Sequence, residues 1–294
     1  MILEQIVSGN IKELESRKIT RPLARLQEMA RQQPAPLDFA AALRGDSVRL
    51  IAEVKKASPS RGVIRADFDP AVIAGAYARG GAAAISVLTE GAYFQGSLGY
   101  LEAIADDMSY DGKGSGNTPA VRGELVEPQV RPSTGSGRKD LAKAASRPPL
   151  LRKDFIVDAY QVYESRAYGA DALLLIASIL TVTELGSLLE LTHRLGMAAL
   201  VEAHDEKEIM LAIESGAKVI GINNRDLKTF KVDIMATAGL RPLVPADRIV
   251  VSESGISCYE DIEYLRSIGV NAALIGEALM TAPDIGQKLK ELRG

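Results

Sequence analysis

The sequence predicts an α/β protein of the (β/α)8 TIM barrel class with an N-terminal helical extension. Short apolar segments recur along the chain, and amphipathic segments with helical spacing separate them at regular intervals. Segments such as ALLLI at 172–176 are apolar on both faces, as strands of a parallel sheet covered by helices are. Six segments carry charged or amide residues at their C-terminal ends, which is costly for a buried strand unless those ends converge on a solvated pocket. An eight-stranded barrel builds such a pocket at its C-terminal face.

Residues 1–48 are interpreted as the N-terminal helical extension. Apolar residues recur at helical spacing through residues 1–30, at Ile2, Ile6, Ile11, Leu14, Leu23, Leu26 and Met29. Pro34 and Pro36 then indicate a loop, and a short turn is expected around 39–43.

From residue 49 onward the chain alternates between strands and helices. Strands are expected at 49–55, 82–88, 149–154, 171–176, 197–202, 218–222, 248–252 and 272–276. Helices are expected at 70–80, 97–108, 158–168, 181–195, 205–215, 232–239, 257–268 and 283–293. Glycines fall just past five of these helices, where a left-handed C-cap is wanted, at Gly80-Gly81, Gly169, Gly196, Gly216 and Gly269. Eight repeats favour one closed barrel over residues 1–294, because an open doubly wound sheet usually has fewer units.

Residues 109–146 interrupt this alternation between the helix at 97–108 and the strand at 149–154. The stretch is rich in glycine, proline and serine and has no sustained periodicity. Connections in α/β units are normally about 2–6 residues long, so this one is anomalous. Its composition predicts a disordered insertion. A helix-to-strand loop lies at the N-terminal face of a barrel, opposite the chemistry.

Composition limits the partners and the compartment. The net charge is −3 and the pI is near 5.6, so there is no electrostatic case for nucleic acid or an anionic membrane. Cys258 is the single cysteine, which excludes an intramolecular disulfide and fits a reducing cytosol. The N-terminal pattern is not that of a signal peptide, and no apolar run reaches the ~20 residues of a membrane span. We expect a soluble cytoplasmic protein, either a monomer or a weak homodimer.

The first strand ends in Glu53, Val54 and Lys55. Strand alternation points Glu53 and Lys55 to the same side, which in a barrel can be the interior mouth. The alternative is a solvated ion pair at the surface. The loop that follows, 58–62, is rich in hydroxyl and backbone donors and suits a polar or anionic substrate.

Two further strands end in groups able to transfer protons. Lys153 closes the third strand and is a candidate Schiff-base nucleophile, a candidate general acid, or half of an ion pair. Glu202 ends the apolar run AALVEA and is a candidate acid or base with an environment-tuned pKa. Its structural alternative is a carboxylate paired with a neighbouring lysine.

The last three strands end in amide, guanidinium and glycine groups. Asn223 and Arg225 follow the sixth strand, and the Arg225 fork can grip a carboxylate or pair with a nearby acid. Gly255 and Gly276 follow the seventh and eighth strands and precede expected helices. Paired glycine turns at these two strands form the phosphate cradle of many barrels, so a phosphorylated small molecule is expected.

The two histidines carry less weight in this interpretation. His193 lies on an expected helix and is taken as exposed, and for His204 packing at the core or rim is favoured over a place at the mouth. No cluster has metal-ligand spacing, and there is no GxGxxG or P-loop motif, so no metal and no nucleotide cofactor are expected.

Several strand-end blocks resemble, in order, those of the indole-3-glycerol phosphate synthase family. The blocks are IAEVKKASPSRG (51–62), SVLTEGAYFQGS (86–97), LLRKDFIVD (150–158), GADALLLI (169–176), LVEAHDE (200–206), IGINNRDL (220–227), SESGI (252–256) and LIGEALM (274–280). The resemblance covers residues 1 to about 105 and about 148 to the end, and it departs at 106–147, where the family has a short loop. It implies ring closure, decarboxylation and dehydration of 1-(2-carboxyphenylamino)-1-deoxyribulose 5-phosphate, with no cofactor.

The resemblance also implies roles for individual residues. Lys153 would be the general acid, Lys55 would bind the anthranilate carboxylate, and Glu202 would be an acid or base in the dehydration. Glu53 and Glu253 would keep the lysines charged and oriented. The expected substrate-binding or pocket-shaping residues are Asn223, Arg225 and Phe155, and the expected phosphate-binding residues are Ser58, Ser254, Gly255, Gly276 and Glu277.

Two rival interpretations remain at this point. One is another phosphate-binding barrel enzyme, either a sugar-phosphate isomerase or an aldolase that uses Lys153 as a Schiff base. The other is a non-catalytic barrel that only binds a phosphorylated ligand. The two further lysine and glutamate positions argue against the aldolase, and the presence of every candidate catalytic residue argues against the non-catalytic barrel.

Overall fold

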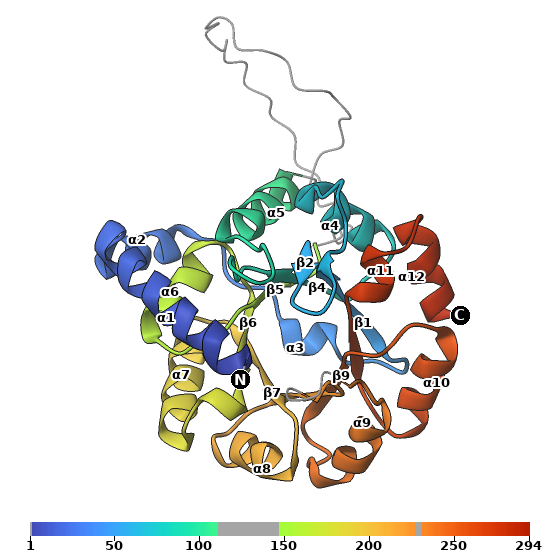
Figure 1. Cartoon of the computed structure of the whole chain (residues 1–294). Coiled ribbons are helices and arrows are strands. Elements are labelled where there is room, and N and C mark those ends of the chain that lie inside the picture. Colours follow the sequence, from blue (N-terminus) through green and yellow to red (C-terminus); the bar gives the residue numbers. More distant parts are fainter. Residues whose placement is uncertain (1, 111–146, 227–230) are drawn as a thin grey trace, which may run out of the picture.

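The computed structural model describes residues 2–110, 147–226 and 231–294 and contains a closed barrel of eight parallel strands (Figure 1). Around the barrel the strand order is β1-β10-β9-β8-β7-β6-β5-β4. Ile51 of β1 pairs with Ala84 of β4 on one side and with Leu274 of β10 on the other, which closes the sheet. The barrel strands are β1 (Arg49–Val54), β4 (Ala84–Leu88), β5 (Leu150–Lys153), β6 (Ala172–Ile176), β7 (Ala198–Ala203), β8 (Val219–Asn223), β9 (Ile249–Glu253) and β10 (Ala272–Ile275). The predicted barrel class is confirmed.

Helices form an outer ring around these strands (Figure 1). They are α4 (Pro70–Arg79), α5 (Leu98–Tyr110), α6 (Ala159–Ala167), α7 (Val182–Arg194), α8 (Glu206–Glu214), α9 (Met235–Leu240), α10 (Tyr259–Ser267), α11 (Glu277–Met280) and α12 (Ile285–Arg293), with short 3-10 turns η1 (Ala177–Ile179) and η2 (Arg241–Leu243). The bounds of the predicted strands and helices differ from the observed ones by at most three residues.

Side-chain caps and glycines set where these helices begin and end. Asp69, Asp158 and Thr181 each accept hydrogen bonds from backbone N–H groups in the first turn of the helix that follows. The predicted left-handed glycines all have positive φ except Gly80, whose φ is −73°, so Gly81 alone takes that role in the pair.

The N-terminal extension closes one end of the barrel and lies over the other. It consists of α1 (Ile2–Thr20), α2 (Leu23–Gln32) and α3 (Phe39–Ala42). Phe39 and Leu43 are fully buried in the same cluster as Ile51 and Leu151, so the α3 segment plugs the barrel interior. In Figure 1, α3 lies within the ring of strands, and α1 runs across the outside near β6 and β7.

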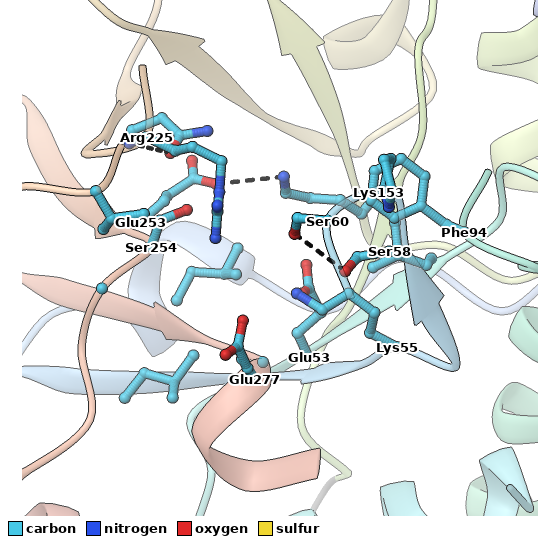
Figure 2. A pocket seen from close by; sticks show the side chains of 18 of the residues that line it. Glu53, Lys55, Ser58, Ser60, Phe94, Lys153, Arg225, Glu253, Ser254 and Glu277 are labelled. Carbon is cyan, nitrogen blue, oxygen red and sulfur yellow. Dashed lines mark hydrogen bonds and ion pairs between the residues drawn. The ribbon is translucent and has the colours of Figure 1, made fainter. Parts of the chain in front are cut away.

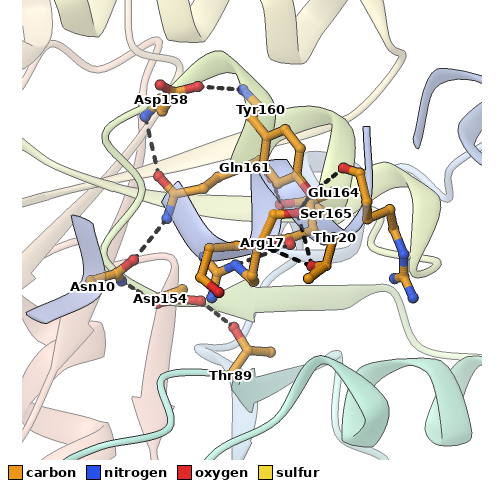
Figure 3. Close-up of polar contacts among 12 residues, drawn as sticks. Asn10, Arg17, Thr20, Thr89, Asp154, Asp158, Tyr160, Gln161, Glu164 and Ser165 are labelled. Atoms are coloured by element: carbon orange, nitrogen blue, oxygen red, sulfur yellow. Dashed lines mark hydrogen bonds and ion pairs between the residues drawn. The ribbon is translucent and has the colours of Figure 1, made fainter. Parts of the chain in front are cut away.

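A buried polar network fastens α1 to strand β5 (Figure 3). Arg152 is fully buried and pairs with Asp154 at 2.8 Å and with Glu164 of α6 at 2.9 Å. Asn10 of α1 donates to Asp154 Oδ1 at 3.0 Å and to the carbonyl oxygen of Phe155 at 3.2 Å. Each of these groups has a buried partner, which is what makes burial of the charges tolerable.

Two segments of the chain can be compared with the predicted domain organisation. The sequence did not predict the two-stranded hairpin of β2 (Ala57–Ser58) and β3 (Gly62–Val63), which follows β1. The predicted insertion at 109–146 lies outside the described residues, apart from the end of α5. Within the described ranges, no helix is long and apolar enough to span a bilayer.

Candidate active site

A cavity of about 690 Å³ opens at the C-terminal ends of the barrel strands (Figure 2). All thirteen residues predicted for the site line it: Glu53, Lys55, Ser58, Lys153, Phe155, Glu202, Asn223, Arg225, Glu253, Ser254, Gly255, Gly276 and Glu277. They come from the barrel strands β1, β5, β7, β8 and β9, from β2, from the start of α11 and from the loops that follow the strands. The barrel thus brings together residues that lie more than two hundred positions apart.

Lys153 lies between two carboxylates at the base of the cavity. Its Nζ is 3.1 Å from Glu202 Oε2 and 3.4 Å from Glu253 Oε2. Burial disfavours the charged amine, but the negative charges of Glu202, Glu253 and Glu53 outweigh burial and raise the pKa of Lys153. The side chain is therefore protonated at neutral pH and holds a proton to donate.

Glu202 has contacts on three sides. Besides Lys153, Asn223 Nδ2 donates to Glu202 Oε1 at 3.0 Å, and His204 Nε2 lies 3.3 Å from the same oxygen. Burial would raise the pKa of Glu202, but Lys153, His204 and Asn223 lower it below its usual range. Glu202 is therefore a carboxylate and can accept a proton.

Glu253 is in a different state from Glu202. It is 1% exposed, and neither of its carboxyl oxygens has a hydrogen-bond partner among the described residues. Burial raises its pKa; Lys153 opposes that shift, while the charges of Glu202 and Glu53 add to it. A Cβ on Gly221 would lie 2.2 Å from Glu253 Oε1, so only glycine leaves room for this carboxyl group.

Glu53 and Lys55 form a second ion pair, with Lys55 Nζ 2.7 Å from Glu53 Oε2. Both side chains reach the cavity, as strand alternation predicts. A Cβ on Gly276 would lie 2.3 Å from Glu53 Oε2 and 2.9 Å from Lys55 Nζ. Gly276 is therefore required by this ion pair, a reason that the phosphate-cradle interpretation did not include.

The loops after β9 and β10 form the upper rim of the cavity. Ser254 has φ 68° and Gly255 φ 80°, and a Cβ on Gly255 would lie 2.4 Å from Val232 Cγ1. Helix α10 begins at Tyr259, two residues later than expected, so the cradle after β9 is loop rather than helix N-terminus. After β10, Gly276 leads directly into the short helix α11 at Glu277, and the Glu277 carboxylate pairs with Arg61 from the β2–β3 hairpin.

An apolar wall completes the cavity, and the sequence analysis missed it. Its members come from α1, from the loop after β4, from β6 and from β10, and they include Leu3, Ile6, Phe94, Leu174, Ile176 and Leu274. Phe94 lies against Phe155, with ring centroids 6.3 Å apart. Glu90 shapes the loop by accepting the backbone N–H groups of residues 92–94. The sequence signal for Phe94 was its place just after a strand end; Leu3 and Ile6 gave none.

Two polar residues beside the site residues point away from the cavity. Arg152 joins the network that holds α1, and Asn224 bonds to Ser252, Ser254 and Thr237. Of the two histidines, His193 is exposed on α7, as predicted. His204 is packed at the rim, as predicted, although it contacts Glu202.

These features define a (β/α)8 barrel enzyme whose site combines two lysines, four glutamates and an apolar wall. Among solved structures, the chain is similar to 3-hexulose-6-phosphate synthase from Salmonella typhimurium, with a TM-score of 0.59, 12% identity and coverage of 84% of this chain and 97% of that one. It is also similar to thiamine phosphate pyrophosphorylase from Pyrococcus furiosus, with a TM-score of 0.55, 16% identity and coverage of 85% and 96%. At these identities the likeness shows the fold alone.

The sequence relatives are more specific. The profile of the family described as indole-3-glycerol phosphate synthase matches residues 3–111 and 137–292. An indole-3-glycerol phosphate synthase from Dehalococcoides mccartyi strain CBDB1 is 52% identical over 293 residues, covering 99% of this chain and all of that protein. One from Roseiflexus sp. strain RS-1 is 46% identical, covering 100% and 98%. The chain belongs to the indole-3-glycerol phosphate synthase family. The resemblance, the enzyme class and the function that the motifs predicted are confirmed.

Proposed function

We propose that this site closes the indole ring of 1-(2-carboxyphenylamino)-1-deoxyribulose 5-phosphate with loss of CO2 and water, and that Lys153 is the general acid. The observation that carries this assignment is the charged Lys153 held between Glu202 and Glu253 beside an apolar wall. Ring closure needs a proton donor at the carbonyl oxygen while the aromatic carbon attacks the carbonyl carbon. Lys153 supplies that proton, and the apolar wall holds the aromatic ring.

Lys55 is proposed to bind the substrate carboxylate. It is paired with Glu53 and presents its amine group to the cavity. A carboxylate next to Lys55 loses CO2 once the new carbon–carbon bond has removed the aromaticity of the ring. Glu202 then serves the dehydration by taking up a proton, since it is held as a carboxylate.

The phosphate group is proposed to lie between Ser254-Gly255 and Gly276-Glu277, with Ser58 and Arg225 nearby. Backbone N–H groups at glycine turns bind such an anion without a side chain in the way. The negative charge of Glu277 would oppose a phosphate, and its pairing with Arg61 offsets that charge.

The charge state of Lys153 argues against the aldolase alternative. A Schiff base forms only from a neutral amine, so aldolase lysines need a lowered pKa. Three carboxylates raise the pKa of Lys153 instead. The decisive test is to incubate the purified protein with the synthetic substrate and record the fluorescence of the indole product. Absence of product, with covalent trapping of a keto-phosphate by borohydride, would favour the aldolase.

We further propose that the enzyme acts in the cytoplasm as one barrel domain, as a monomer or weak homodimer. Its single cysteine is free, which fits a reducing compartment. Sedimentation equilibrium over a range of protein concentrations measures the oligomeric state.

A further inference from the structure

The reaction proposed above consumes one proton per turnover. The substrate carboxylate leaves as neutral CO2, so substrate anion and one proton give the indole product, CO2 and water. This proton must come from solvent. Yet the groups that handle protons are largely covered, since the side chains of Lys153 and Glu202 are only 16% and 5% exposed. A bound substrate covers them further, because both line the cavity that the substrate fills.

His204 connects this covered pair to the protein surface. It follows β7 directly and does not line the cavity; its Nε2 is 3.3 Å from Glu202 Oε1. On the other side of the ring, Nδ1 is 3.0 Å from Glu208 Oε2 on α8. The same Glu208 oxygen accepts the backbone N–H of His204 at 2.8 Å, which fixes the two residues relative to each other. The Glu208 side chain is 18% exposed and so meets solvent.

We propose that Glu208 and His204 form a proton route from solvent to Glu202 and Lys153, separate from the mouth of the cavity. After Lys153 has given its proton to the substrate, the His204 imidazolium passes its Nε2 proton to Glu202, and Glu202 passes a proton to the neutral Lys153 amine. The neutral His204 ring keeps its proton on Nδ1, so the nitrogen left without a proton is Nε2. The ring turns to present Nε2 to Glu208, accepts there a proton that Glu208 has taken from solvent, and turns back as the imidazolium. One solvent proton therefore enters for each one consumed.

The charges around His204 give this transfer its direction. Two ionisable groups among the described residues face the His204 ring, namely Glu202 on β7 and Glu208 on α8. Lys153 on β5 lies beyond Glu202. Burial disfavours the imidazolium, but the two carboxylates outweigh burial and raise the pKa of His204 to about 10. The ring is thus charged at neutral pH, whereas the neutral Lys153 amine is a stronger base still. The proton therefore moves downhill toward Lys153.

The 3.3 Å contact between His204 Nε2 and Glu202 Oε1 is an ion pair rather than a directed hydrogen bond. Nε2 has no hydrogen-bond partner among the described residues. A small rotation of the imidazole is enough to direct Nε2–H at the carboxylate, because both groups are already in contact. His204 and Glu208 are therefore positioning and relay residues that do not touch the substrate.

The test compares His204→Gln and Glu208→Gln with His193→Gln, the matched control on the exposed surface of α7. Steady-state kcat and KM, the solvent deuterium isotope effect on kcat and rescue by added imidazole are measured with the fluorescent product. We expect H204Q to lower kcat at least tenfold, within the range for loss of a proton-transfer group, and to change KM by less than about threefold. The solvent isotope effect rises, and imidazole restores part of kcat. E208Q gives a smaller effect of the same kind, and H193Q equals the wild type.

Three outcomes would overturn the route. One is an H204Q kcat within twofold of wild type with an unchanged isotope effect; another is a loss of activity that imidazole does not restore and that appears mainly in KM. If H204Q does not fold, E208Q decides alone, because Gln can still accept the backbone N–H of His204: an unchanged kcat and isotope effect in E208Q rejects the route. Failure of the proposed function is separate, since the wild-type enzyme would then give no indole product in the same assay.

Discussion

Glu202 and Glu253 both contact the Lys153 amine, and their environments shift their pKa values in opposite directions. Glu202 is held as a carboxylate by Lys153, His204 and Asn223, whereas Glu253 has no hydrogen-bond partner among the described residues and its pKa is raised. Neighbouring carboxyl groups with pKa values pushed apart are the usual basis for dividing acid and base roles in one site. At the residue scale, the site consists of a proton donor, Lys153, in contact with a proton acceptor, Glu202.

Gly276 gives a prediction at the scale of a single atom. Gly276→Ala places a Cβ 2.3 Å from Glu53 Oε2 and 2.9 Å from Lys55 Nζ, so the ion pair must separate. Both atoms end flexible side chains, so we expect the free energy of unfolding to fall by only about 1 kcal/mol. We expect kcat/KM to fall by about tenfold or more, a loss of ~1.4 kcal/mol in transition-state stabilisation.

Gly186 provides the control for that substitution. It lies inside helix α7, and a Cβ there meets nothing within 4 Å. Gly186→Ala should leave kcat/KM unchanged and stabilise the protein by up to about 1 kcal/mol through helix propensity. Equal activity of the two alanine variants would mean that the Glu53–Lys55 pair has no role in turnover.

His204 gives a prediction about stability against pH. Its pKa in the folded protein, about 10, lies above the ordinary value of 6.5, so protonation favours the folded state. This contribution is fully present below about pH 6.5 and is lost as pH rises through about 10. Denaturant unfolding of wild type and His204→Gln from pH 6 to pH 10 should show a difference in unfolding free energy that shrinks with pH. A difference that grows with pH would contradict the ion pairs assigned to the ring.

At the scale of elements, strand ends and strand alternation made most of the site predictable. Side chains along a strand face the interior at every second position, so the shared direction of Glu53 and Lys55 could be predicted from the pattern. The same rule separates Asn223, which enters the cavity, from its neighbours. Lys153 and Glu202 were candidates because each ends an apolar strand, and their roles came from the family resemblance. What the pattern cannot supply is contact between elements that are distant in sequence.

The apolar wall and the relay residues show this limit. Leu3 and Ile6 look like any apolar pair on an amphipathic helix, and only the docking of α1 brings them to the cavity. That docking depends on Asn10 meeting Asp154, 144 positions away. His204 was taken as a packed rim residue because its partner Glu208 lies on the next helix and is one of many surface glutamates in the sequence. Tertiary contacts, rather than local preference, decide these roles.

The α1 anchor gives the prediction at this scale. Asn10→Ala removes one of the two donors to Asp154 Oδ1, which keeps the Phe155 N–H, and one of the two donors to the Phe155 carbonyl, which keeps Gln161 Nε2. Loss of these two hydrogen bonds should cost about 1–3 kcal/mol of unfolding free energy. Since α1 carries part of the apolar wall, we also expect KM to rise by about threefold or more while kcat changes less. Thermal unfolding and steady-state kinetics measure both. Ser8→Ala on the exposed side of α1 is the control, and an Asn10→Ala protein matching it would show that the hydrogen bonds do not position the helix.

At the scale of the whole molecule, the barrel places its site residues at one end of the strands and the α5-to-β5 connection at the other. The cavity residues lie at the C-terminal ends of the strands, while the connection from α5 to β5 enters at the N-terminal end of β5. The eight-fold plan and the strand and helix bounds were predictable because each repeat has its own pattern of apolar residues. The predicted insertion in that connection remains a prediction.

The predicted insertion between α5 and β5 can be tested by replacing residues 112–136, which the family profile does not match, with a four-residue turn. We expect kcat/KM to stay within about threefold, because the connection leads to the N-terminal end of β5 and the cavity is at the C-terminal ends of the strands. We expect the melting temperature to rise slightly, since loop-closure cost grows by roughly 0.6 kcal/mol per doubling of length. A shortened enzyme that folds but has lost its activity would mean that the segment contributes to the site.

Lys153 is the centre of the account, and its removal is the most direct test. Lys153→Ala is compared with Lys207→Ala, a substitution of an exposed lysine on α8, by measuring kcat for indole product formation alongside circular dichroism and thermal unfolding. We predict that Lys153→Ala keeps its fold and loses about 10²–10⁴-fold in kcat, as expected for loss of a general acid, while Lys207→Ala keeps wild-type turnover. A folded Lys153→Ala enzyme with more than about a tenth of the wild-type kcat would contradict the assignment of Lys153 as the acid.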